Sequence, residues 1–342
     1  MIVGAGVIGL ATALAAQDRG ARVTVLEAEA PGAEQSVGPG RIFRHIHDLD
    51  ELVPLAVAAR RGWEEAGERF ARPLVDDRGA LLVGGPRDRY AASLAAAGVA
   101  HELLAPDDLP PQLAPLGRGL LDPGGGTIDA EAYVAALARA LADRIEFAPA
   151  HEILDEPGGP AVITDHRRID AGAVLISAGA ATPGLAAPLG LAPPVATTEH
   201  RRVAFGGTSG EGLPCVLERS ATQPMSGYLT PLPGGGVSLG TGAADDLPED
   251  DAVALTAGYL SAILPGADPA PTGVVRCEST VLAGHSEALG LYRADRVAAF
   301  AGGNMFKHAP ALGPMLAEAV LEGRVDPLLA PPEVASARLE RP

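Results

Sequence analysis

The first nine residues, Met1-Ile2-Val3-Gly4-Ala5-Gly6-Val7-Ile8-Gly9, decide the fold, because an apolar start runs directly into the pattern G-x-G-x-x-G. Residues 10–19 are rich in small alanines and predict a helix that packs closely on a sheet, and Gly20 is typical of a helix end. Residues 22–26 predict a second strand, which Glu27 closes. This order of strand, glycine turn, helix, strand and acid predicts a dinucleotide-binding unit.

Each part of this unit has its own task in holding a dinucleotide. Gly4 permits the tight turn, Gly6 lets the backbone approach a pyrophosphate, and Gly9 lets the helix lie close to the strand. The helix N-terminus attracts phosphates, and Glu27 accepts hydrogen bonds from a ribose while repelling a 2′-phosphate, which disfavours NADP. A glycine-rich turn without a ligand is the alternative. The predicted cofactor-binding residues here are Gly4, Gly6, Val7, Ile8, Gly9 and Glu27.

Composition excludes several classes of partner. The 342 residues carry a formal net charge of −17, which repels nucleic acid and anionic membrane surfaces. The apolar runs are too short for a membrane span, and no basic segment precedes the first of them, as a secretory signal would require. Two cysteines, Cys215 and Cys277, are too few for a disulfide framework, so we expect a cytoplasmic protein.

Pieces of a nucleotide-binding domain recur along the chain instead of following one another. A Gly/Pro-rich loop over residues 31–40 follows Glu27, where a contiguous NAD domain would continue with further strands. Apolar strands that end in small-residue turns are predicted much later, at residues 173–180 and 297–303, and a helix follows near residues 311–322. The nucleotide domain is therefore predicted to be interrupted by insertions.

This layout resembles the FAD-dependent glycine/D-amino-acid oxidase superfamily, and within it the monomeric sarcosine oxidase and N-methyltryptophan oxidase branch. The resemblance rests on the N-terminal fingerprint, on Arg41-Ile42-Phe43-Arg44-His45, on the stretch around Cys277 and on residues 302–313. It implies an α/β fold in which an inserted substrate domain, built on an antiparallel sheet, interrupts a Rossmann-like FAD-binding domain. The predicted FAD-binding domain comprises residues 1–75, 126–188 and 280–328, the substrate domain residues 76–125 and 189–279, and the tail residues 329–342.

The resemblance also assigns the substrate site. Arg44 would bind the substrate carboxylate, for which the planar guanidinium fork is suited, and Arg41 would lie near the flavin ring. Lys307 would share the carboxylate with Arg44, and it is the only lysine in the chain. Surface arginines and a solvated loop lysine are the alternatives. Further expected contacts of the flavin are Ala178, Gly179, Gly302, Gly303, Asn304 and Phe306.

Two positions bear on how the flavin is held and reoxidised. Cys277 matches the cysteine that forms a thioether to the flavin in this branch, with Arg276 beside it to lower its pKa, although Ser36 and Val37 stand where linked members have a histidine pair. A buried structural cysteine is the alternative. Ser238 stands where the branch has a lysine that speeds the reaction with oxygen. We therefore expect slow use of oxygen, help from another cation such as His308 or an arginine, or a different acceptor.

Two segments that contain histidines allow more than one interpretation. His45 and His47 alternate, but no further ligands complete a metal site, so none is expected. The segment His200-Arg201-Arg202 is read as the surface of an edge strand, with a place in the substrate pocket as the alternative.

The predicted function is the FAD-dependent oxidation of a C–N bond beside a carboxylate, giving an imine, in a secondary, cyclic or free amino acid. We expect the reaction to belong to specialised metabolism. Arg44, Lys307, Arg41 and His308 are the expected catalytic residues. An NAD-linked dehydrogenase and a non-catalytic module with the FAD fold are the alternatives.

Overall fold

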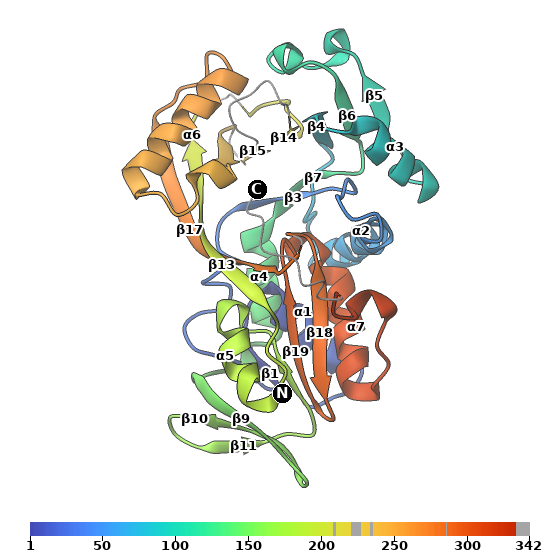
Figure 1. Ribbon diagram of the computed structural model, residues 1–342, viewed down its shortest axis with the longest axis vertical. Coiled ribbons are helices and arrows are strands. Elements are labelled where there is room, and N and C mark those ends of the chain that lie inside the picture. Colours follow the sequence, from blue (N-terminus) through green and yellow to red (C-terminus); the bar gives the residue numbers. More distant parts are fainter. Residues whose placement is uncertain (208–209, 220–226, 233–234, 285, 333–342) are drawn as a thin grey trace. The chain divides into compact units, whose positions relative to one another are not determined.

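A computed structural model describes residues 1–207, 210–219, 227–232, 235–284 and 286–332 (Figure 1). The chain divides into two compact units. Unit 1 comprises residues 1–37, 132–197 and 278–342, and unit 2 comprises residues 38–131 and 198–277. Most of the predicted tail, residues 333–342, lies outside the described residues.

Unit 1 is built on a six-stranded sheet with the order β18-β19-β12-β1-β2-β8. All neighbours pair in parallel except β18, which is antiparallel to β19. The strands are β1 (Ile2–Val3), β2 (Val25–Glu27), β8 (Ile145–Phe147), β12 (Val174–Ile176), β18 (Leu289–Ala294) and β19 (Val297–Gly302). The Rossmann-like sheet expected from the first residues is confirmed, and its pieces come from both ends and the middle of the chain.

Helices α1 (Val7–Asp18) and α7 (Ala309–Glu322) pack directly on each other in unit 1. A Cβ on Gly313 would lie 2.7 Å from the carbonyl oxygen of Ala11, so only a glycine permits this approach. Unit 1 also holds a small antiparallel sheet, β9 (Ala150–Glu156), β10 (Gly159–Thr164) and β11 (Arg168–Asp170), and helix α5 (Thr182–Ala186). Helix α4 (Ala130–Ala140) begins in unit 2 and continues into unit 1.

Unit 2 is built on an eight-stranded sheet with the order β17-β13-β16-β15-β14-β4-β6-β5. Its ladders are largely antiparallel, and β14 pairs with β4 in parallel. The strands are β4 (Ala80–Gly84), β5 (Glu102–Leu104), β6 (Gly119–Asp122), β13 (Val195–Phe205), β14 (Cys215–Arg219), β15 (Gly227–Pro231), β16 (Val237–Gly240) and β17 (Pro271–Leu282). The antiparallel substrate domain predicted by the resemblance is confirmed as a class of architecture.

The two faces of this sheet differ in character. Val203, Leu239 and Leu229 lie on one face, in an apolar core that helix α6 (Glu249–Ile263) covers. The register places a second row on the opposite face, in which Arg202 pairs with Gly240 and Gly240 with Tyr228. Directly paired residues share a face, so arginine and tyrosine side chains stand together there.

The sheet face that carries Tyr228 also packs against the first segment of unit 2. Strand β3 (Gly40–Phe43) pairs with β7 (Gly126–Asp129), and helices α2 (Leu52–Arg69) and α3 (Arg87–Ala96) follow in the chain. The sequence places residues 38–75 with the nucleotide domain, whereas they pack in unit 2. The reason is that Ile42, Ile46 and Val53 join an apolar cluster with residues of β4, β6 and β14.

Candidate active site

The predicted cofactor residues of unit 1 gather at one edge of its sheet. Parallel strands direct their carboxyl ends to the same edge, which is where ligands of such sheets bind. The glycine turn follows β1, Glu27 ends β2, Ala178 and Gly179 follow β12, and Gly303 follows β19. Segments that are far apart in the sequence therefore meet at the edge expected for a nucleotide.

The three glycines of the fingerprint differ in what surrounds them. Gly4 has φ +103°, and a Cβ there would lie 2.6 Å from the carbonyl oxygen of Ser177. At Gly9 a Cβ would lie 2.0 Å from the carbonyl oxygen of Gly4. At Gly6 the nearest atom to a Cβ would be the Ser36 hydroxyl, at 3.5 Å. Gly4 and Gly9 are thus required by the protein itself, while Gly6 leaves free space that a ligand can use.

Glu27 and Ser36 complete the turn with hydrogen bonds to its backbone. The Glu27 carboxylate accepts from the amide of Ala5 at 2.7 Å and from the amide of Glu29 at 3.0 Å. The amide of Val7, at the start of α1, donates to the Ser36 hydroxyl at 3.0 Å. Ser36 thus has a local structural role at the position where the resemblance expects a histidine.

The turn after β19 positions Lys307. Asn304 has φ +61°, and a Cβ on Gly303 would lie 2.0 Å from the carbonyl oxygen of Ser286. The Lys307 side chain is 3% exposed, and its Nζ donates to the carbonyl oxygen of Asn304 at 2.8 Å. The reading of Lys307 as a solvated loop residue is therefore wrong. His308 is fully buried at the start of α7.

In unit 2, two guanidinium groups share one carbonyl oxygen. Arg41 Nη1 donates to the carbonyl oxygen of Gly40 at 2.9 Å, and Arg202 Nη1 donates to the same oxygen at 3.2 Å. Burial, followed by the neighbouring charge of Arg202, lowers the pKa of Arg41 to about 9. Two like charges held this close together favour a nearby anion.

Tyr228 lies beside this arginine pair and begins a chain of hydrogen bonds. Its hydroxyl is 2.7 Å from Nε2 of His200, and Nδ1 of His200 is 2.5 Å from Oδ1 of Asp245. The two rings stack, with centroids 6.0 Å apart. Burial raises the pKa of Tyr228 to about 12. A Cβ on Gly240 would lie 2.4 Å from the hydroxyl oxygen, so a glycine is needed opposite this tyrosine.

Sequence reasoning missed Tyr228 and misread its neighbours on β13. The edge-strand reading of residues 200–202 is wrong, because β13 lies between β17 and β16 and both Arg201 and Arg202 are 5% exposed. The alternation of His200 and Arg202 was the available signal, since residues two apart on a strand share a face. Nothing in the sequence around Tyr228 marks its hydroxyl as the partner of a histidine.

Cys277 is buried, whereas its neighbour Arg276 is not. Arg276 is exposed and forms an ion pair with Glu199 at 3.4 Å, because adjacent residues of β17 point to opposite faces of the sheet. Cys277 interacts electrostatically with Arg41. Cys215 is fully buried, and burial raises the pKa of its thiol to about 12, as expected for a structural cysteine.

The segment after β3 is buried as well. Arg44 is 7% exposed, which overturns its reading as a surface arginine. Asp122 accepts from the backbone amide of His45 at 2.6 Å, and its Oδ1 lies 3.0 Å from Nδ1 of that ring. His45 is therefore held by a carboxylate of β6. Within the described ranges no group of three or more His, Cys, Asp or Glu side chains could hold a metal ion.

Arg44 belongs to unit 2 and Lys307 to unit 1. Their joint action on one carboxylate therefore stays a prediction, and so do the roles of the other predicted residues.

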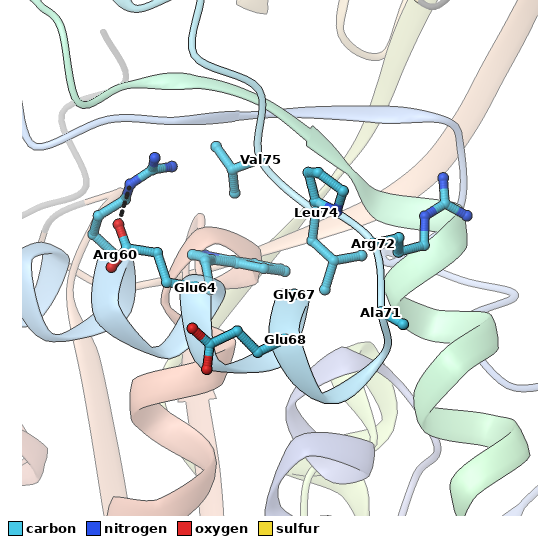
Figure 2. Close-up of a pocket in the computed structure, with 10 residues that line it drawn as sticks. Arg60, Glu64, Gly67, Glu68, Ala71, Arg72, Leu74 and Val75 are labelled. Atoms are coloured by element: carbon cyan, nitrogen blue, oxygen red, sulfur yellow. Dashed lines mark ion pairs between the residues drawn. The ribbon is translucent and has the colours of Figure 1, made fainter.

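A separate hollow of about 360 Å³ lies in unit 2, between α2 and residues 71–75 (Figure 2). Trp63 and Leu74 line it, and Arg60 and Glu64 form an ion pair of 3.4 Å at its side. None of the predicted site residues belongs to its lining.

Comparisons with known proteins identify the family of the chain and solved structures with a similar fold. The family model described as FAD dependent oxidoreductase (DAO) matches residues 1–319, while the search of curated proteins found no match. Among solved structures, NikD, described as an unusual amino acid oxidase essential for nikkomycin biosynthesis, is 24% identical with a TM-score of 0.85, covering 96% of each chain. Glycine oxidase from Geobacillus kaustophilus is 20% identical with a TM-score of 0.82, covering 97% of each chain. L-proline dehydrogenase from P. horikoshii is 20% identical with a TM-score of 0.83, covering 96% of each chain.

Within the described residues, no helix is both long and apolar enough to cross a bilayer.

Proposed function

The chain belongs to the FAD dependent oxidoreductase family, and on this premise we propose that it oxidises the C–N bond of an amine that carries a carboxylate. The product would be an imine. The observation that carries the proposal is the Arg41–Arg202 pair, whose two guanidinium groups share the carbonyl oxygen of Gly40. A small carboxylate would relieve their repulsion and would fix the neighbouring carbon for reaction.

The residues of unit 1 fit FAD. The space above Gly6 and the first amides of α1 suit a pyrophosphate, and the Glu27 carboxylate at the end of β2 suits a ribose. When bound, FAD would accept the hydride that leaves the substrate carbon, and with it the two electrons of the oxidation. The family match favours FAD over the nicotinamide alternative. A covalent link through Cys277 is part of the proposal, and the charge of Arg41 would favour the thiolate that such a link requires.

The chain's own residues bind and orient the substrate. Arg44, which is buried in unit 2, and Lys307, which is buried in unit 1, are each proposed as a ligand of the substrate carboxylate. A protein of net charge −17 repels anions over most of its surface, so a site with several cations has to be assembled locally. Secondary, cyclic and free amino acids all carry the required carboxylate and nitrogen.

The electron acceptor is oxygen or another oxidant. Ser238 pairs with Ala204 and Thr230 on the same face of the sheet as Tyr228. Arg202 lies two residues along the ladder, opposite Gly240, and is proposed as the cation that acts at this position. The related glycine oxidase is named as an oxidase and the related L-proline dehydrogenase as a dehydrogenase, so both kinds of acceptor are compatible with the fold.

The test is anaerobic titration of the purified, FAD-loaded protein with a panel of secondary, cyclic and free amino acids. We expect at least one of them to bleach the flavin absorption band, and the matching amines without a carboxylate to leave it unchanged. If the amines without a carboxylate also bleach the flavin, the proposed role of the arginines and Lys307 in binding the carboxylate is refuted. A yellow protein that no carboxylated amine reduces would support the non-catalytic alternative, and a colourless active protein the nicotinamide alternative.

A further inference from the structure

Asp245, His200 and Tyr228 form a continuous hydrogen-bonded chain in unit 2. They come from three separate segments: Asp245 follows the short helix Gly242–Ala244, His200 lies on β13 and Tyr228 lies on β15. The distances are 2.5 Å from Asp245 Oδ1 to His200 Nδ1 and 2.7 Å from His200 Nε2 to the Tyr228 hydroxyl. The Asp245 and His200 side chains are 20% and 18% exposed, so the chain runs from a partly solvated carboxylate to a phenol beside the arginine pair.

The chemistry of the first member determines the direction of every hydrogen bond. An ionised carboxylate only accepts, so His200 must carry a proton on Nδ1. In a neutral imidazole the other nitrogen then has a lone pair, and Tyr228 must donate its hydroxyl proton to Nε2. The Tyr228 oxygen then donates its proton to His200, and its lone pairs can accept a hydrogen bond from a third group. The ionised Asp245 therefore determines that Tyr228 acts as an acceptor toward that group.

The charges around Tyr228 narrow the identity of that third group. Arg41 and Arg202 stabilise its ionised form, whereas Cys277 and Asp245 oppose it, and burial keeps the phenol protonated at neutral pH. The same two arginines are the proposed partners of the substrate carboxylate. An amino acid anchored there carries a nitrogen within a few bonds of that carboxylate, and its N–H groups are donors that match the oxygen's lone pairs.

We propose that Tyr228 accepts the proton that the substrate ammonium must lose before its C–N bond can be oxidised, and that His200 and Asp245 are the positioning residues that direct this transfer. The idea rests on the proposed function for the identity of the substrate. An N–H bond of the ammonium breaks as a new O–H bond forms on Tyr228, and the original hydroxyl proton moves to Nε2 of His200. The products are a neutral amine and an imidazolium paired with Asp245, with no change in the number of electrons.

The direction of the chain is tested by the ¹⁵N shifts of the His200 ring nitrogens in the FAD-loaded protein, assigned by their loss in His200→Gln. We expect the Nδ1–H form in the unsubstituted protein. In Asp245→Asn the amide can donate to Nδ1, so the ring should switch to the Nε2–H form. Asp246→Asn is the matched control, because the Asp246 carboxylate accepts from the backbone amide of Glu199 and plays no part in the chain. An Nε2–H form in the unsubstituted protein would overturn the proposal.

The proton transfer is tested by the rate of flavin reduction under anaerobic conditions in Tyr228→Phe and His200→Gln. Loss of a general base lowers rates by about 10²–10⁴-fold, and we expect at least a hundredfold loss at pH 7. The loss should shrink as the pH approaches about 10, where free amines lose their proton without help. The affinity for a small carboxylate without nitrogen should stay within about twofold, because the arginines are untouched.

A merely structural role for the chain predicts a rate loss that is the same at every pH, and that result would refute the proton transfer. If no carboxylated amine reduces the flavin even in the unsubstituted protein, the proposed function fails. The tautomer measurement needs no substrate, and it then decides separately whether the chain is directed as we infer.

Discussion

Gly6→Ala should separate cofactor binding from folding. The backbone at Gly6 has φ −68° and ψ 173°, which alanine adopts without strain, and the nearest atom to the added Cβ is 3.5 Å away. Substitutions of this kind change the free energy of unfolding by no more than about 1 kcal/mol in either direction. The added methyl group would nevertheless occupy the space through which a pyrophosphate reaches the backbone.

The expected loss of FAD affinity follows from the hydrogen bonds that would be displaced. A hydrogen bond to a charged group contributes about 1.5–3 kcal/mol. Loss of one such bond raises the dissociation constant of FAD about 10- to 100-fold, since about 1.4 kcal/mol is a factor of ten. We therefore expect at least tenfold weaker binding of FAD, with the unfolding midpoint of the cofactor-free protein nearly unchanged.

Gly9→Ala is the matched control, with the opposite pattern. Its Cβ would lie 2.0 Å from the carbonyl oxygen of Gly4, so α1 or the turn has to move. Overpacking of this kind costs about 1–3 kcal/mol, which lowers the melting temperature by about 2–4 °C for each kcal/mol. Thermal unfolding of the cofactor-free proteins, together with fluorescence titration with FAD, measures both quantities. Normal FAD affinity in Gly6→Ala, or equal destabilisation by the two substitutions, would refute the reasoning.

The remaining predictions concern the substrate and the flavin. Lys307→Met should raise KM for a carboxylated amine by at least about tenfold, since a buried charge pair contributes more than 1.4 kcal/mol, and steady-state kinetics would measure it. Because the charged form of Arg41 is lost as the pH rises through about 9, the affinity for a carboxylate inhibitor should fall above that pH and be constant below it, as equilibrium titration would show. Cys277→Ser should abolish flavin fluorescence on a denaturing gel if the unsubstituted protein shows it, and fluorescence that persists would place the link elsewhere. Ser238→Lys should speed reoxidation of the reduced protein by oxygen in stopped-flow mixing, and an unchanged rate would count against a role for charge at this position.

The glycine turn and helix at the sheet edge of unit 1 could be predicted in detail because their physics is local. Gly4, Gly9 and Gly20 each report a backbone constraint that few other residues satisfy, and their spacing alone predicts a turn, a close packing and a helix end. Gly4 and Gly20 have φ +103° and +80°, and α1 ends at Asp18. Glu27 could be placed by local reasoning as well, because the change from apolar residues to an acidic one marks the point where β2 reaches the sheet edge.

The polar face of unit 2 was beyond such reasoning, because strand register creates it. Arg202, Gly240 and Tyr228 come together only when β13, β16 and β15 pair in one register, and a shift by one residue would send each side chain to the opposite face. The same limit applies to Arg276 and Cys277, which are neighbours in sequence but lie on opposite faces of the sheet. Residues 38–75, which the sequence places with the nucleotide domain, pack in unit 2 because their partners, such as Leu82 and Leu120, come later in the chain.

The net charge of the whole protein and the local charge of the Arg41–Arg202 pair together restrict the charge that a substrate can carry. The net charge of −17 opposes the approach of any anion, so a dicarboxylate arrives against the field of the whole protein. The Arg41–Arg202 pair attracts a carboxylate only at short range, where screening by salt has little effect. A zwitterion with one carboxylate and one ammonium has no net charge, so it meets no long-range barrier and still satisfies the arginines. Its ammonium would also face the acceptor side of Tyr228. Reduction rates at low substrate concentration should therefore rise with added salt for dicarboxylates and change little for zwitterions.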